Sequence, residues 1–205
     1  MDWIAWLSLA GICTLGAMSP GPSLLIVMRN AASGVRQGMA AAVAHGIAIA
    51  VYAGLTAFGL AVLITSSPAV FTALQWAGAA LLLYLGWKSL RATGSDSGTA
   101  EKPRAPVPVH RAALQGFGVA FFNPKVVIFF TALFSQFVTE QQSFTIKLGM
   151  AALASAIDAA WYCLVAIAVT AGSRGAWISE SVSRRLQQLL GILLVALAAR
   201  LVLSI

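Results

Sequence analysis

Proline interrupts two long apolar runs in this chain, and this feature limits the folds available to it. Pro-Gly-Pro at 20–22 lies within an apolar run over about 3–28, and Asn-Pro-Lys at 123–125 lies within a second run over about 112–138. A proline inside a helix costs about 3 kcal/mol, because it removes a hydrogen bond and clashes with the preceding turn. In a bilayer the freed backbone groups must contact protein or a wet cavity. Broken helices at matching positions of two halves are typical of secondary transporters with a site at the breaks.

The composition indicates that lipid is the main solvent of this chain. Only 9% of its 205 residues are charged and 60% are hydrophobic, whereas soluble domains carry about 25% charged residues. A bilayer-spanning helix needs about 20 apolar residues. We therefore predict an all-α polytopic membrane protein with six transmembrane helices, over about 3–28, 38–63, 69–88, 112–138, 147–172 and 186–204.

A polar segment divides the chain into two halves. Residues 91–111 are rich in Gly, Ser, Pro and mixed charges, a composition that cannot form a packed core. We predict a flexible cytoplasmic linker there, between a first three-helix repeat over 1–90 and a second over 112–205. Because three is an odd number, two related halves would be inserted in opposite orientations, as in transporters built from inverted repeats.

The positions of the basic residues predict the orientation. The net charge of +7 would suggest nucleic acid as the partner of a soluble protein, but here the cations gather at helix ends, so we predict no nucleic-acid partner. Cytoplasmic loops are enriched in Lys and Arg, and we therefore predict that both termini are periplasmic. The predicted cytoplasmic side holds Arg29, Arg36, Lys88, Arg91, Lys102, Arg104, Arg111, Arg174, Arg184 and Arg185, against Lys147 and Arg200 on the other side or in the last span.

Two charged residues lie near the predicted midplane of the membrane, where a charge is costly and usually functional. Lys125 directly follows the second break, and Asp158 lies about halfway along the fifth predicted span. Two readings are open. The residues form a structural ion pair, which lowers the cost of burying both charges, or they belong to a substrate or proton site.

Three further residues extend this candidate site. Asp158, Trp161 and Tyr162 share a helical face by their spacing, and an acid beside aromatic rings suits an ammonium group. Alternatively, Asp158 accepts a proton and couples transport to the proton gradient. His45, in the second predicted span, is a candidate proton relay because histidine titrates near neutral pH; its alternative role is packing.

The first break exposes backbone groups that can bind a ligand. A helix that restarts at about residue 22 presents free N–H groups and the positive end of its dipole, which suit a carboxylate. The second break adds an asparagine amide that can donate and accept hydrogen bonds. A helix end for a carboxylate and an acid for an ammonium group together describe an amino-acid zwitterion. The predicted substrate-binding residues are Ser19, Pro20, Gly21, Pro22, Ser23, Asn123, Pro124, Lys125, Asp158, Trp161 and Tyr162, and the predicted proton-coupling residues are Asp158 and His45.

The sequence lacks the motifs that several catalytic and cofactor-binding functions require. The chain has no Gly-x-x-x-x-Gly-Lys-Ser/Thr phosphate loop, and its two histidines and two cysteines form no metal-ligand pattern. Cys13 and Cys163 read as small apolar residues of membrane helices. We predict no cofactor, no metal and no catalytic residues. A membrane-embedded enzyme using Lys125, Asp158 and His45, or an accessory subunit of a larger membrane complex, remain the alternatives to a transporter.

The motifs resemble a known family. Gly16-Ala17-Met18-Ser19-Pro20-Gly21-Pro22 and the connection from Gly34 to Gly38 resemble the first-helix signature of the lysine exporter/homoserine–threonine resistance family (LysE/RhtB), and Asn123-Pro124-Lys125 and Asp158 with Trp161 resemble its second-half features. The resemblance implies an amino-acid exporter of the bacterial inner membrane, driven by protons and assembled as a homodimer or higher oligomer. Because Asp158 is the one clear intramembrane acid, we expect a small neutral substrate such as threonine or homoserine.

Overall fold

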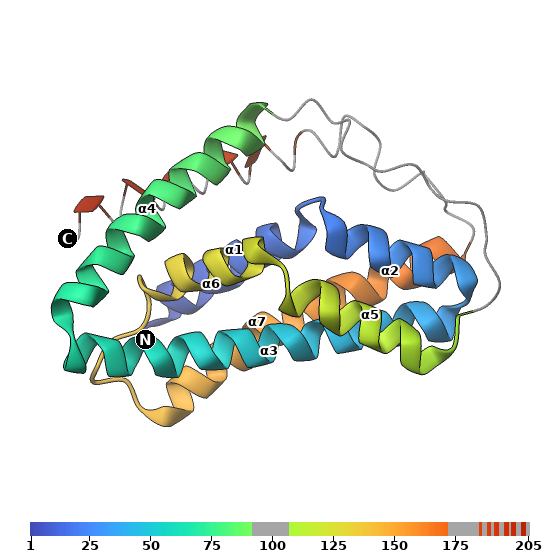
Figure 1. Cartoon of the computed structure of the whole chain (residues 1–205), viewed down its shortest axis with the longest axis horizontal. Helices are drawn as coiled ribbons and strands as arrows, with labels where there is room; N and C mark the ends of the chain where they lie inside the picture. The colour runs from blue at the N-terminus through green and yellow to red at the C-terminus, as the bar shows by residue number, and fades with distance from the viewer. Residues whose placement is uncertain are drawn as a thin grey trace.

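The computed structural model describes residues 1–91 and 107–171, together with single residues between 185 and 203. Within these ranges the chain is all-α (Figure 1). The central part of the predicted linker, residues 92–106, and much of the sixth predicted span, 186–204, lie outside the described residues, as do Arg174 and Arg184.

The first predicted span is a broken helix. Helix α1 (Trp3–Met18) is capped by Asp2, whose carboxylate accepts a hydrogen bond from the Ala5 N–H at 2.8 Å. It ends where Ser19 is extended, since Pro20 follows and disfavours helical geometry at the residue before it. Helix α2 (Pro22–Ser33) restarts with a proline in its first turn, where the missing N–H has no cost. The two helices meet at 63°.

Two long helices complete the first half. Gly34, with φ of +150°, ends α2 in a conformation that glycine adopts far more readily than other residues, and α3 (Val35–Ser66) follows immediately. Helix α4 (Pro68–Arg91) turns back at the end of α3 and also contacts α6 (Figure 1). Helix α3 is longer than the predicted span 38–63, because its apolar pattern continues without a breaker until Pro68.

The second predicted break is also present. Helix α5 (Val109–Phe121) begins inside the stretch predicted as linker, so the margins of that stretch are helical. Helix α6 (Pro124–Phe134) starts directly after Asn123, at 57° to α5. Helix α7 (Phe144–Thr170) follows, capped by Ser143. The second half therefore repeats the order of a broken helix followed by a long one.

The length and composition of these helices fit a bilayer. Among the residues that the structure describes, two apolar stretches are long enough to cross it alone, Val35–Gly59 in α3 and Phe144–Thr170 in α7, and the number rises to four if each bent pair forms one span. These four correspond to the first, second, fourth and fifth predicted spans. The crossing of α4 and of the last predicted span, and the inverted relation of the two halves, stay predictions.

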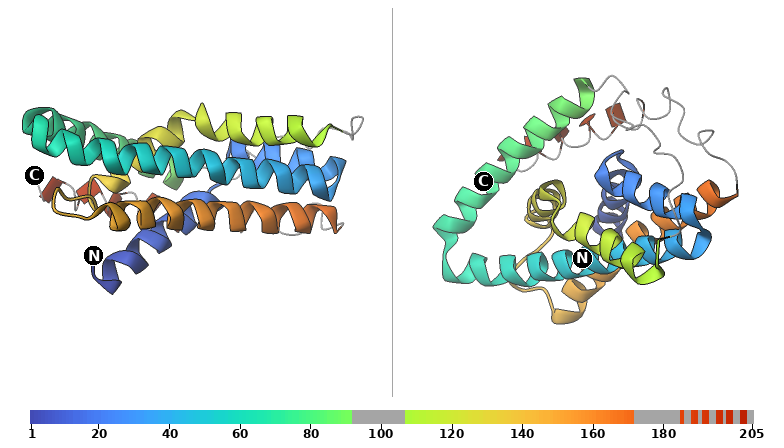
Figure 2. Two further views of the ribbon diagram at one scale, coloured as in Figure 1. Left: turned by 90° about the horizontal axis from the view of Figure 1, so that it is seen from below. Right: turned by 45° about the vertical axis from the view of Figure 1, so that its right-hand side comes forward.

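Helix α3 is the centre of the packing, against α7 on one side and α5 on the other (Figure 2, left). Small residues allow these close contacts: a Cβ added at Gly46 would lie 2.7 Å from the Cβ of Ala159 on α7. Small residues at such contacts let the backbones of membrane helices approach closely. The four arms of the two broken helices pack around this α3–α7 pair, so that both breaks face it (Figure 1).

Candidate functional site

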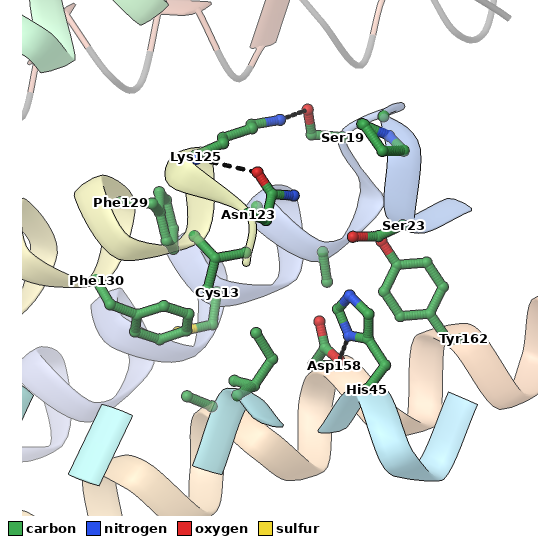
Figure 3. Close-up of a pocket in the computed structure, with 17 residues that line it drawn as sticks. Cys13, Ser19, Ser23, His45, Asn123, Lys125, Phe129, Phe130, Asp158 and Tyr162 are labelled. Atoms are coloured by element: carbon green, nitrogen blue, oxygen red, sulfur yellow. Dashed lines mark hydrogen bonds and ion pairs between the residues drawn. The ribbon is translucent and has the colours of Figure 1, made fainter. Parts of the chain in front are cut away.

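A cavity of about 70 Å³ lies between the two helix breaks and the α3–α7 pair. A cavity needs about 10–15 Å³ of such volume to hold one water molecule, so this cavity has room for several waters or a small solute. Side chains from α1, α2, α3, α6 and α7 line it (Figure 3). The long sequence separation of these elements explains why no single motif encodes the site.

A hydrogen bond joins the two breaks across one end of the cavity. The Lys125 ammonium group donates to the Ser19 hydroxyl at 2.6 Å, from the first turn of α6 to the residue that ends α1 (Figure 3). Both residues line the cavity. The positive charge near the second break therefore lies beside the first break.

A buried carboxylate–imidazole pair lies at the opposite end. His45 Nδ1 of α3 lies 2.6 Å from Asp158 Oδ2 of α7, and the two residues are only 2% and 7% exposed. Figure 3 shows both side chains below the cavity, while Lys125 and Ser19 lie above it. Asp158 thus has a partner other than Lys125, the one considered from the sequence. Among the described residues His45 Nε2 has no hydrogen-bond partner, so it is available to a ligand or a proton.

The two breaks differ in how their helices begin. At α6 the Asn123 side chain accepts a hydrogen bond from the Lys125 N–H at 3.0 Å, so this helix is capped by its own asparagine. At α2 the cap is Gly21, and no side chain of the described residues caps the helix. The N–H groups and the dipole of α2 therefore remain available to an anion in the cavity.

Tyr162 connects the α2 end to the buried pair. Its hydroxyl points toward the Ser23 side chain in the first turn of α2 (Figure 3). Its ring centroid lies 4.6 Å from that of His45. Tyr162 is 3% exposed and lies one turn after Asp158 on α7. The contact fixes the distance between the uncapped helix end and the His45–Asp158 pair.

The remaining wall is apolar. It includes the buried side chains of Cys13 from α1, Ile49 from α3, Phe129 and Phe130 from α6 and Ala154 from α7, and Gly16, Ala17 and Val126 complete it. In Figure 3 the two phenylalanines lie on the side of the cavity away from Tyr162 and Ser23. The cavity is therefore polar at two ends and apolar along one flank.

Most residues proposed from the sequence come together here. The predicted residues that line the cavity are Ser19, Gly21, Pro22, Ser23, His45, Asn123, Lys125, Asp158 and Tyr162. Pro20 forms the break without being among the lining residues, and the side chain of Pro124 lies outside the described part of the chain. Trp161 is not among the lining residues. It packs, partly buried, against the apolar cluster that includes Leu24, Val27 and Tyr162.

The apolar wall was missed by the sequence reasoning, although its spacing carries a signal. Cys13, Gly16 and Ala17 precede Pro20 at intervals of seven, four and three residues, so they share the face of α1 that ends at the break. Phe129 and Phe130 follow Val126 in the same way on α6. Projecting a helical face from each break would have identified them.

Comparison with known proteins identifies the family. The family of LysE type translocators matches residues 14–205, a range that includes both breaks and all the polar residues of the cavity. The chain belongs to this family. Leucine efflux proteins of Salmonella typhimurium and Salmonella typhi are each 29% identical to it over 203 residues, which cover 96% of this chain and 93% of theirs. An uncharacterized membrane protein of Pseudomonas aeruginosa is 35% identical over 127 residues, 58% of this chain and 57% of that protein. No solved structure matches the chain.

Family membership decides between the classes considered from the sequence. LysE type translocators are transport proteins, so this translocator is a membrane transporter and not an enzyme, and the relatives support export of amino acids. The resemblance found from the sequence motifs is thereby confirmed. In the described part of the chain no group of three or more His, Cys, Asp or Glu side chains is placed to hold a metal ion.

Proposed function

We propose that this translocator exports a neutral amino acid from the cytoplasm in exchange for protons. The observation that carries the proposal is the arrangement of charge in one cavity. The uncapped end of α2 and the Lys125 ammonium group lie at one end, and the Asp158 carboxylate lies at the other. An α-amino acid has a carboxylate and an ammonium group on one carbon, which matches this polarity.

The carboxylate of the substrate binds at the first break. It accepts hydrogen bonds from the N–H groups of the first turn of α2, beginning at Ser23, because Pro22 has none. The Lys125 ammonium group, which already reaches Ser19, adds a positive charge at the same place. The ammonium group of the substrate then lies toward Asp158, where the His45 ring and Tyr162 ring close the space.

The His45–Asp158 pair carries the proton. At 2.6 Å the imidazole and the carboxylate share one hydrogen bond, and Nε2 of the ring faces the cavity (Figure 3). When a substrate ammonium group approaches Asp158, a proton held by the pair is released, because two positive charges in one buried site repel each other. Binding of the amino acid from one side of the membrane and binding of the proton from the other side therefore exclude each other. Antiport requires this mutual exclusion.

The proposed substrate is neutral because the described cavity has one carboxylate. A second cationic group, as in lysine, would lack a partner beside the apolar wall of Phe129, Phe130 and Ile49. Threonine and homoserine remain candidates, and the relatives named for leucine efflux add leucine.

The proposed setting is the bacterial inner membrane, with halves 1–90 and 112–205 as inverted repeats, both termini periplasmic and the protein a homodimer. The basic residues at one set of helix ends support this orientation. A cysteine placed at exposed Asp2 should react with an impermeant thiol reagent from outside intact cells; reaction only after permeabilisation would contradict the orientation. Sedimentation of the detergent-purified protein tests the dimer.

The test compares transport in proteoliposomes with and without an imposed pH gradient, using labelled leucine, threonine, homoserine and lysine. Wild type is compared with Asp158→Asn, and with Asp2→Asn as the matched control. Asp2 is exposed and caps α1 outside the cavity, and asparagine caps a helix about as well as aspartate. Both variants make the same chemical change, but only one alters the cavity.

We expect gradient-driven movement of neutral amino acids in wild type and Asp2→Asn. Asp158→Asn should reduce it at least about tenfold, a loss of about 1.4 kcal/mol of interaction. Unchanged gradient-driven transport in Asp158→Asn would remove Asp158 from the coupling mechanism. Folded wild-type protein that moves none of these amino acids would overturn the substrate class.

A further inference from the structure

The apolar wall of the cavity rests on a glycine. A Cβ added at Gly16 in the last turn of α1 would lie 2.8 Å from Cζ and 3.2 Å from Cε1 of Phe129. Distances this short are repulsive between carbon atoms, whose optimal separation is about 3.5–4.0 Å. The Phe129 ring therefore occupies its position only because residue 16 has no side chain.

The surroundings of Phe129 determine where its ring goes if it is pushed. Phe129 is 8% exposed, and the ring of Phe130 stands against it edge to face with centroids 5.4 Å apart. Helix α1 closes the side of Gly16, and the cavity lies on another side, since both Gly16 and Phe129 line it. Because packed protein resists displacement more than an open space does, a methyl group at residue 16 moves the ring into the cavity.

We propose that Gly16 and Phe129 together set the largest side chain that the translocator accepts. This inference rests on the proposed amino-acid export and assigns the substrate side chain to the apolar wall. With the carboxylate at the α2 end and the ammonium group toward Asp158, the third substituent of the α-carbon is directed at the flank of Cys13, Phe129 and Phe130. Phe129 contacts the side chain of the substrate, and Gly16 acts as a positioning residue for Phe129.

A glycine that serves only helix packing would have different consequences. Its replacement would lower the transport of every amino acid by a similar factor, because the whole site would be displaced. A glycine that controls the volume of the side-chain subsite changes the ratio between large and small substrates. One methylene group in an apolar pocket typically changes discrimination about 10–200-fold.

The experiment measures the leucine-to-alanine ratio of transport rates in proteoliposomes under one pH gradient. Gly16→Ala is compared with wild type and with Gly11→Ala on the same helix, where an added Cβ meets nothing within 4 Å. We expect the ratio to fall about tenfold or more in Gly16→Ala and to stay unchanged in Gly11→Ala. Alanine transport should fall much less than leucine transport in Gly16→Ala, and it should stay at the wild-type level in Gly11→Ala.

A compensating variant separates a volume effect from a folding defect. Phe129→Leu removes the ring atoms that the new methyl group would strike, so Gly16→Ala/Phe129→Leu should recover the wild-type ratio. Phe129→Leu alone should raise the phenylalanine-to-alanine ratio, which also tests the proposal if Gly16→Ala fails to fold. Equal loss for leucine and alanine, or no recovery in the double variant, would overturn the proposed subsite. Wild type that moves no amino acid would instead overturn the proposed function.

Discussion

Helix α5 contacts α3 so closely that one added methyl group should separate them. A Cβ at Gly116 would lie 2.7 Å from the carbonyl carbon and from the Cα of Ala41, and it would also strike the Ala41 carbonyl oxygen. All three are backbone atoms of a long helix, so no side-chain rotation relieves the contact. Gly118, two residues further along α5, provides the control, because an added Cβ there meets nothing within 4 Å.

The expected magnitude follows from two opposed effects. Alanine is favoured over glycine in a helix by about 1 kcal/mol, a gain that applies to both positions. Overpacking costs about 1–3 kcal/mol, and occasionally more. We therefore expect Gly118→Ala to keep or raise stability, and Gly116→Ala to be less stable than Gly118→Ala by about the overpacking cost, since the propensity gain cancels between them.

Thermal unfolding in detergent, followed by size-exclusion of the fluorescently tagged protein, measures the difference. For a chain of this size about 1 kcal/mol corresponds to about 2–4 °C in Tm, so the two variants should differ by about 2–12 °C. Equal Tm values for Gly116→Ala and Gly118→Ala would refute the reasoning. Because α5 ends at the second break, Gly116→Ala should also weaken transport by moving Asn123 relative to α3.

Two further predictions concern the site. His45→Gln should reduce gradient-driven transport at least about tenfold (about 1.4 kcal/mol), because glutamine cannot carry the proton shared with Asp158. The control His110→Gln, at an exposed position, should transport like wild type. Equal transport activity of the two variants would show that His45 is not part of the proton pathway. Pro20→Ala or Pro22→Ala should abolish transport while leaving membrane insertion intact, since a continuous helix satisfies the N–H groups that the break exposes. If transport survives both changes, the break is only a kink in the helix and has no role in substrate binding.

The helix breaks could be predicted from the sequence because their cause is local. Pro20 and Pro124 cannot continue a helix, whatever surrounds them, and the structure bends the chain at both places. The expected boundaries were less accurate, because apolar composition does not mark where a helix ends. Helix α3, for example, extends to Ser66 although the predicted span ended at residue 63.

The partner of Asp158 could not be predicted in the same way. Lys125 was the partner considered from the sequence, and His45 was expected only as a proton relay or a packing residue, because the sequence gives no distance between helices. Close packing of Gly46 against Ala159 brings α3 so near to α7 that His45 and Asp158, on adjacent positions of the same interface, meet directly. The pairing thus depends on which helices pack together, a tertiary property, and not on the charge pattern.

The two breaks look alike in the sequence, but they differ in how the N-terminus of the following helix is capped. Asn123 satisfies the first free N–H group of α6, so this helix end has less to offer an anion. Gly21 has no side chain, and the end of α2 stays open toward the cavity. Capping α6 holds the backbone of Lys125, and its side chain then reaches across to Ser19, beside the open end. The second break therefore places its charge beside the first. Under the proposed function, the two breaks together bind the one carboxylate of the substrate.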